Sequence, residues 1–167
     1  RWEEAERDWL EALPIYEELQ DETAIVRICL AAANQILWAT RYEEGYELCK
    51  RGLASISEDP SPGRCRLLAV AAGGAGQAGD LETAEPMIEG ALEQAESSGF
   101  PPRILGEMLI SKGFIEFAFM KHEAAHATAL AGVELLRDLD DNGVASHHAV
   151  ALWTLQRCGR LEEARAL

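Results

Sequence analysis

The chain has 167 residues, 48% of them hydrophobic, which suits one domain with a sizeable apolar core. Its formal net charge of -14 at pH 7 argues against direct nucleic-acid binding, because contacts with phosphates depend on Lys and Arg. No uncharged apolar run reaches about eighteen residues, and residues 1–4 do not resemble a secretory signal. We therefore expect a cytoplasmic protein that makes no membrane contact.

One pattern recurs along the chain: a large residue or His, then Glu, then a variable position, then a small residue. Its copies begin at Trp2, Tyr42, Leu81, His122 and Leu161, which are 39 to 41 residues apart. A second small residue follows seven positions after the first, at Ala12, Gly52, Ala91 and Gly132. Twelve positions before the first small residue lie Ala33, Ala72, Gly113 and, as the exception, Leu152. Helices whose axes approach closely need small residues where they cross, so this register predicts packed helix pairs.

Taken in chain order, the pattern predicts a helix over residues 2–20 and then helix pairs separated by loops rich in Pro, Gly, Ser and Asp. The expected pairs are 23–39 with 42–57, 63–78 with 81–98, and 102–119 with 121–139, followed by a helix over 144–158. We expect a single repeat domain over 1–167. It would comprise a partial repeat at 1–20, full repeats at 23–57, 63–98 and 102–139, and the start of another at 144–167.

These small residues, together with the turn Gly79-Asp80-Leu81, resemble the signature of the tetratricopeptide repeat family. The resemblance implies an all-α fold, a right-handed α-solenoid of antiparallel helix pairs. The units are longer than the family's usual length of about 34 residues. In this they are similar to repeats of bacterial multidomain regulators, including signal-transduction ATPases, LuxR-type activators and nucleotide cyclases. Because the chain begins and ends inside a repeat, we expect the parent protein to continue on both sides.

The resemblance also implies where a partner would bind, because the first helix of each pair lines the concave face in this family. The candidate partner-binding residues on that face are Leu30, Asn34, Leu37, Trp38, Gln77, Ile110, Phe114, Phe117, Trp153 and Arg157. This mostly apolar and aromatic set favours a peptide, an amphipathic helix or a neighbouring domain over an acidic tail. The alternative is that tight curvature or an adjacent domain buries the aromatic side chains permanently.

The segment His122–His126 matches the HExxH motif of zinc hydrolases, in which two His bind zinc and the Glu, here Glu123, acts as a base. Ala125, however, occupies the small site of the repeat, so this helix is expected to pack against its neighbour. The other His residues, His147 and His148, fall in the next predicted helix, about 20 Å along from His122. A zinc hydrolase is therefore the weaker alternative, and we expect no metal and no enzymatic activity.

The stretch from Gly74 to Gly79 matches GxGxxG, the phosphate-binding loop of dinucleotide-binding folds. The chain shows no strand pattern, and the match falls within the expected helix over 63–78 and the turn after it, so we expect no dinucleotide. Gly73, Gly74 and Gly76 each weaken that helix by about 1 kcal/mol relative to Ala. We expect these glycines to allow close approach of a neighbouring helix; the alternative is a notch on the inner surface.

The sequence thus favours a protein interaction or sensor module within a larger bacterial signalling or transcription-regulating protein, with no cofactor. The expected partner is a protein or peptide, which includes another domain of the same chain. A self-associating scaffold, held together through the open ends of the solenoid, is the alternative. The cysteines have no CxxC spacing and lie in apolar stretches, so we expect buried free thiols at Cys29, Cys49, Cys65 and Cys158.

Overall fold

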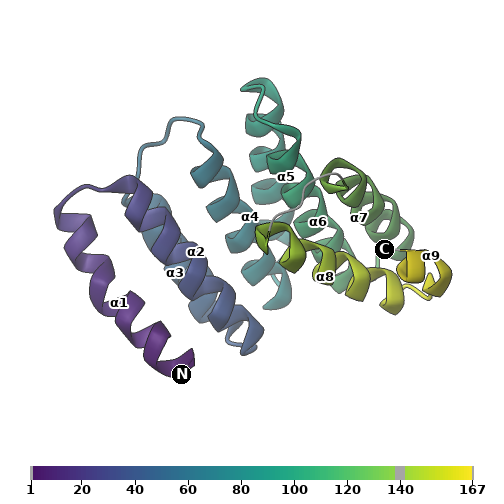
Figure 1. Ribbon diagram of the computed structural model, residues 1–167, viewed down its shortest axis with the longest axis horizontal. Helices are drawn as coiled ribbons and strands as arrows, with labels where there is room; N and C mark the ends of the chain where they lie inside the picture. The colour runs from purple at the N-terminus through teal and green to yellow at the C-terminus, as the bar shows by residue number, and fades with distance from the viewer. Residues whose placement is uncertain (1, 138–141, 167) are drawn as a thin grey trace.

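The computed structural model describes residues 2–137 and 142–166, and within these ranges the chain is all-α and has no β-strand (Figure 1). The helices are α1 (Trp2–Glu18), α2 (Glu22–Trp38), α3 (Tyr42–Ala54), α4 (Pro62–Gln77), α5 (Leu81–Ser97), α6 (Pro102–Ala118), α7 (His122–Leu136), α8 (Asn142–Arg157) and α9 (Leu161–Ala166). They agree with the predicted ranges to within about three residues, and α3 ends at Ala54 rather than at residue 57. The predicted end of α7, at 139, lies outside the described residues.

Capping side chains and left-handed turns set the ends of the helices. Asp21, Ser61 and Asp80 each accept a hydrogen bond from the backbone N–H three residues later, which satisfies a donor at the start of α2, α4 and α5. After α4, Gly79 turns the chain with a φ of 93°, a conformation that favours glycine. Thr40 adopts a φ of 62° at the equivalent turn after α2, where a β-branched residue is strained.

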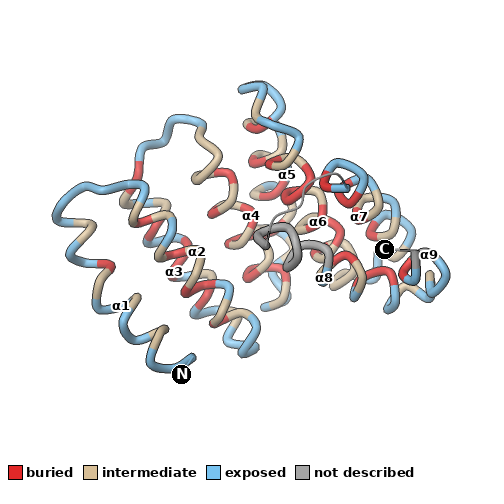
Figure 2. The backbone as a smooth tube through the Cα atoms, in the orientation of Figure 1, coloured by how far each residue is buried: buried red, intermediate tan, exposed pale blue. Residues whose placement is uncertain are grey.

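The helices are arranged as a row in which even-numbered and odd-numbered helices make different contacts. Every helix packs against the next one along the chain, and α2, α4, α6 and α8 also contact one another in that order. Buried residues occur along most of the row, where neighbouring helices pack together (Figure 2). The result is a repeat-like helical architecture with a core that runs from helix to helix. No described helix is long and apolar enough to cross a membrane.

Small residues let the paired helices approach closely, as the register predicts. The closest crossing joins α6 and α7, where a Cβ added at Gly132 would lie 2.8 Å from the carbonyl oxygen of Gly106 and 3.0 Å from the backbone nitrogen of Ile110. A Cβ added at Gly113 would lie 3.0 Å from the carbonyl oxygen of Ala125. Ala125 is itself fully buried, so the small site of this repeat is used for packing.

Ion pairs connect odd-numbered helices to the turns that lead into the next odd-numbered helix. In each case a basic residue directly before one helix pairs with a Glu of the previous odd-numbered helix. The pairs are Glu6–Arg41, Glu85–Lys121 and Glu123–Arg160. These side chains are partly or largely exposed, so each pair stabilises the fold by at most about 1 kcal/mol. Because these pairs occur at equivalent positions, the repeat is visible in surface side chains as well as in the core.

Substitution of glycine by alanine should have opposite effects on stability at two positions, one at the crossing of α6 and α7 and one in α5. Gly132→Ala should destabilise the protein by about 1–3 kcal/mol, because the new Cβ would overlap the α6 backbone. Gly90→Ala in α5 is the matched control, since no atom lies within 4 Å of the added Cβ. Gly90→Ala should stabilise the helix by up to about 1 kcal/mol. Thermal unfolding followed by circular dichroism should move the two midpoints in opposite directions; equal shifts would contradict the packing described here.

The pair between Glu17 of α1 and Arg51 of α3 predicts a pH-dependent contribution to stability. A side-chain hydrogen bond from Arg51, at 2.5 Å, holds the pKa of Glu17 below its ordinary value of 4.5. The stabilisation is therefore complete above pH 4.5 and is lost as the pH falls through the lowered pKa. Glu17→Gln should cost less than about 1 kcal/mol at neutral pH, because both side chains are partly exposed.

Urea unfolding of the wild type and Glu17→Gln at neutral pH and at about pH 3 checks this expectation. The difference in unfolding free energy should shrink at the lower pH, where the wild-type carboxylate becomes protonated. An unchanged difference would show that the Glu17 carboxylate does not carry the effect.

Candidate functional site

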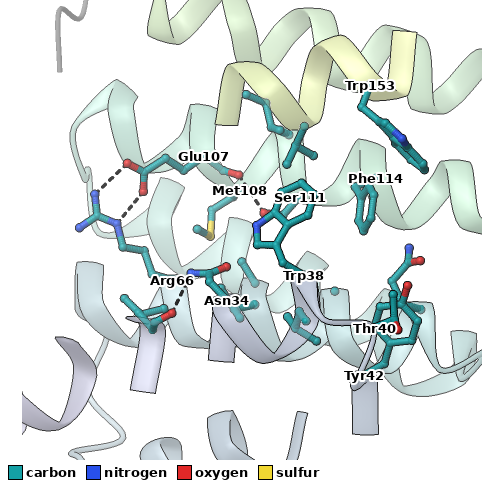
Figure 3. A pocket seen from close by; sticks show the side chains of 18 of the residues that line it. Asn34, Trp38, Thr40, Tyr42, Arg66, Glu107, Met108, Ser111, Phe114 and Trp153 are labelled. Carbon is teal, nitrogen blue, oxygen red and sulfur yellow. Dashed lines mark hydrogen bonds and ion pairs between the residues drawn. The ribbon is translucent and has the colours of Figure 1, made fainter. Parts of the chain in front are cut away.

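A cavity of about 630 Å³ lies among the even-numbered helices (Figure 3). Its wall is formed by side chains of α2, α4, α6 and α8, together with Thr40 in the turn after α2 and Tyr42, the first residue of α3. The volume falls in the range of about 300–1,000 Å³ that is typical of sites for small molecules. The face formed by the even-numbered helices is therefore hollowed at its centre.

Eight of the ten predicted partner-binding residues line this one cavity. They are Leu30, Asn34, Leu37 and Trp38 of α2, Gln77 of α4, Ile110 and Phe114 of α6, and Trp153 of α8. The register of the repeat places them on the same face, although they are spread over more than 120 residues of sequence. The structure thus brings these positions together; their role in binding a partner stays a prediction.

The other two predicted residues, Phe117 and Arg157, lie beside Trp153 and not on the cavity wall. The ring of Phe117 meets the ring of Trp153 edge to face, with centroids 5.1 Å apart, and also contacts His122. The guanidinium carbon of Arg157 lies 5.7 Å from the centroid of the Trp153 ring, within the range of a cation–π contact. Both residues therefore hold the orientation of a side chain that does line the cavity.

Aromatic side chains form one end of the cavity. Phe114 and Trp153 are in contact, with ring centroids 5.3 Å apart and planes inclined by 54°. Trp38, the last residue of α2, is 65% exposed and lies between these rings and the opposite end of the cavity (Figure 3). A large aromatic side chain left this exposed at a cavity is typical of a binding surface, because it offers a large apolar area at little cost in conformational entropy.

A buried carboxylate with two arginines forms the other end of the cavity. Glu107 of α6 is only 2% exposed, and its carboxylate accepts hydrogen bonds from Arg66 Nε at 2.5 Å and Arg66 Nη2 at 2.9 Å. Arg103 Nε, one turn earlier in α6, donates to the same carboxylate at 2.9 Å. Burial of a charge needs such partners, so Glu107 fixes both guanidinium groups at this end. The two arginine side chains stay about one third exposed, at 32% and 33%.

The sequence analysis did not identify Glu107, although a signal for it was present. Glu107 lies six residues before the small residue Gly113 of its helix, and Arg66 lies six residues before the equivalent Ala72. Opposite charges at the same register position of successive even-numbered helices face each other across the interface. Comparison of the charged residues at each repeat position would have revealed the pair.

The glycines of α4 separate into two kinds. A Cβ added at Gly74 would lie 3.2 Å from the backbone nitrogen of Tyr46, and one at Gly76 would lie 3.4 Å from Ile115, so these two glycines allow close packing as expected. Gly73 differs, because no atom lies within 4 Å of its added Cβ and it lines the cavity. The expectation of close packing is therefore wrong for Gly73, which forms the notch that was the alternative.

The residues of the HExxH match make packing contacts and an ion pair. His122 packs against Phe117, and its Nδ1 lies 3.9 Å from the sulfur of Cys158. The Glu123 carboxylate pairs with Arg160 at 3.1 Å. Among the side chains that the structure describes, which leave out those of residues 138–148, no three of His, Cys, Asp or Glu are grouped to hold a metal ion. The side chains of His147 and His148 lie outside the described residues.

The GxGxxG match lies in the last turn of α4 and the turn after it, and no strand precedes it in the described part of the chain.

The cysteines are free thiols. Cys29, Cys49 and Cys65 are buried, as expected, whereas Cys158 is only partly buried. Burial raises the pKa of Cys29 to about 11 and also raises that of Cys158. Raised pKa values are the opposite of what an activated thiolate nucleophile requires.

The fold and the cavity define an all-α, repeat-like helical protein with a hollowed face. No protein-family model matches the chain, and no curated protein matches it. Among solved structures, the chain is similar to the crystal structure of BtubC (BKLC) from P. vanneervenii, with a TM-score of 0.65 and 14% sequence identity. The similarity covers 95% of this chain and 72% of that chain. At this identity, it supports the fold alone.

The two kinds of glycine in α4 predict different outcomes for the same substitution at adjacent positions. Gly73→Ala should stabilise the protein by about 0.5–1 kcal/mol, because the methyl group enters open space and the helix gains propensity. Gly74→Ala should give no gain or a loss of about 1 kcal/mol, because the methyl group presses on the α3 backbone. Urea unfolding of both variants checks this, and a gain at Gly74 equal to that at Gly73 would contradict it.

Proposed function

We propose that the chain is a right-handed α-solenoid of antiparallel helix pairs, similar to tetratricopeptide repeats, with the even-numbered helices on its concave face. The repeat of about 40 residues supports this, as does the contact of each even-numbered helix with the next. In the described part of the chain, no two odd-numbered helices have backbones in close contact, as expected on the wider, outer side of a curved row.

We further propose that this face binds an apolar peptide segment of a partner protein. The observation that carries the proposal is the group of aromatic side chains, Trp38, Phe114 and Trp153, around a preformed cavity. Large aromatic side chains in a concave site supply much of the binding energy in peptide recognition. Phe117 and Arg157 support the ring of Trp153, so this part of the site is ordered before a partner arrives.

The wider role follows from the same family resemblance. We propose an interaction or sensor module of a larger cytoplasmic signalling or transcription-regulating protein, without enzymatic activity of its own. The cavity supports this role, because its described wall combines apolar and aromatic side chains with one carboxylate that two arginines hold in ion pairs.

Selection of peptides from a random display library on the purified chain tests the proposal. The selected peptides should be rich in apolar residues. Trp38→Ala and Phe114→Ala should each weaken their binding by about tenfold or more, because both rings would contact the anchoring side chains. Trp2→Ala is the matched control, since Trp2 is also largely exposed but lies on α1, away from the cavity. Fluorescence polarisation of labelled peptides gives the affinities.

Far-UV circular dichroism of the variants is part of the same test. Folded variants with weakened binding support the peptide site. Unfolding of both cavity variants would show that the rings belong to the core, and equal binding to the Phe114→Ala variant would show that the peptides bind elsewhere.

A further inference from the structure

The notch at Gly73 interrupts a regular row of side chains on the face of the even-numbered helices. One residue after the recurring small site of each helix lie Asn34 in α2, Gly73 in α4, Phe114 in α6 and Trp153 in α8, and all four line the cavity. Helix α4 contacts both α2 and α6, which do not contact each other. The notch in α4 therefore has a larger side chain at the equivalent position of the helix on either side.

The position one turn earlier shows the same difference between the helices. It is Ala69 in α4, whereas it is Leu30 in α2 and Ile110 in α6. Residues four apart in a helix lie on the same face, so Ala69 and Gly73 extend the notch along one turn of α4, about 6 Å. The notch is thus about as long as one large side chain.

Helix packing does not account for the glycine at this position. A Cβ added at Gly74 would lie 3.2 Å from the backbone nitrogen of Tyr46, whereas one added at Gly73 would have no atom within 4 Å. Gly73 lies inside α4, where glycine lowers the stability of a helix relative to alanine. The missing side chain therefore weakens the helix, and what it provides is open volume in the cavity.

The surroundings of the notch favour an aromatic side chain. Trp38 and Phe114 both present rings to the cavity (Figure 3), and Trp38 is largely exposed. Ala69 and Ile110 are buried and add apolar wall. Aromatic rings in contact attract each other beyond the effect of the area that they bury. A ring inserted here would contact both aromatic and aliphatic groups.

We propose that the notch at Gly73 is the pocket for one aromatic side chain of the bound peptide and that Gly73 determines this preference. The inference rests on the proposed peptide site and adds the identity of its anchoring residue. An anchor that fills a desolvated pocket supplies a large share of the binding energy. A side chain at residue 73 would occupy the pocket in place of the anchor.

Peptide selection on variants of residue 73 tests this preference. The random display library should yield peptides with Phe, Tyr or Trp at one shared position when it is selected on the wild type. Selection on Gly73→Leu should yield small residues at that position, because the leucine side chain fills the notch. Gly90→Leu in α5 is the matched control, since its added Cβ also has no atom within 4 Å and Gly90 does not line the cavity. Its peptides should keep the aromatic position.

Fluorescence polarisation of one peptide selected on the wild type measures the size of the effect. Replacement of its aromatic residue by Ala should weaken binding to the wild type by about tenfold or more. Gly73→Leu should weaken binding of the aromatic peptide by a similar factor. The two changes together should cause little further loss, because both remove the same contact. Gly90→Leu should bind both peptides as the wild type does.

Gly73→Ala separates binding from stability. This variant should unfold at a higher urea concentration than the wild type, because alanine is the better helix former. It should nevertheless bind the aromatic peptide about threefold more weakly, because its methyl group enters the notch. A residue with a purely structural role would not change stability and binding in opposite directions.

Two results would overturn the inference alone. One is wild-type affinity of Gly73→Leu for the aromatic peptide, and the other is a set of selected peptides without a shared aromatic position. The proposed peptide site would stand in both cases if Trp38→Ala still weakened binding. A library that yields no binding peptide would overturn the inference and the proposed function together. If Gly73→Leu loses its cooperative unfolding transition, Gly73→Ala takes its place, and wild-type affinity of that variant would overturn the inference.

Discussion

The close approach of helix backbones at small residues is the constraint on which the rest of this structure depends. At Gly113 and Gly132, the backbones of α6 and α7 lie so near each other that a single added methyl group would overlap the partner helix. Because small side chains occupy the contact between paired helices, the larger side chains of the even-numbered helices are placed on other faces. The cavity and its aromatic wall are formed from those larger side chains.

Much of this organisation could be predicted, because each structural position of a repeat occurs several times in the sequence. The recurring small residues set the helix ranges and, through the family resemblance, the face on which Trp38, Phe114 and Trp153 meet. Phe117 and Arg157, predicted on the same face, lie beside the Trp153 ring and not on the cavity wall. Their role in binding a partner stays a prediction, because a repeat register gives the face of each helix but not which of its side chains surround a cavity.

The features that the sequence did not reveal depend on neighbours in space. An acid in an amphipathic helix is ordinarily expected to be solvated, so the burial of Glu107 became visible only with Arg66 and Arg103 placed around it. Gly73 and Gly74 are adjacent and look alike in sequence. A rotation of about 100° between successive helical residues directs one position to the cavity and the other to α3.

Contacts in this chain are local, since every described helix touches only helices one or two positions away along the row. In such an array, stability is approximately a sum of unit and nearest-neighbour terms, and the ends can open while the centre stays folded. The cavity is the exception, because its wall extends from Leu30 to Trp153 and includes side chains of α2, α4, α6 and α8 and of the first residue of α3. A molecule held there would join distant units, so that fraying at α2 and at α8 would become parts of one cooperative transition.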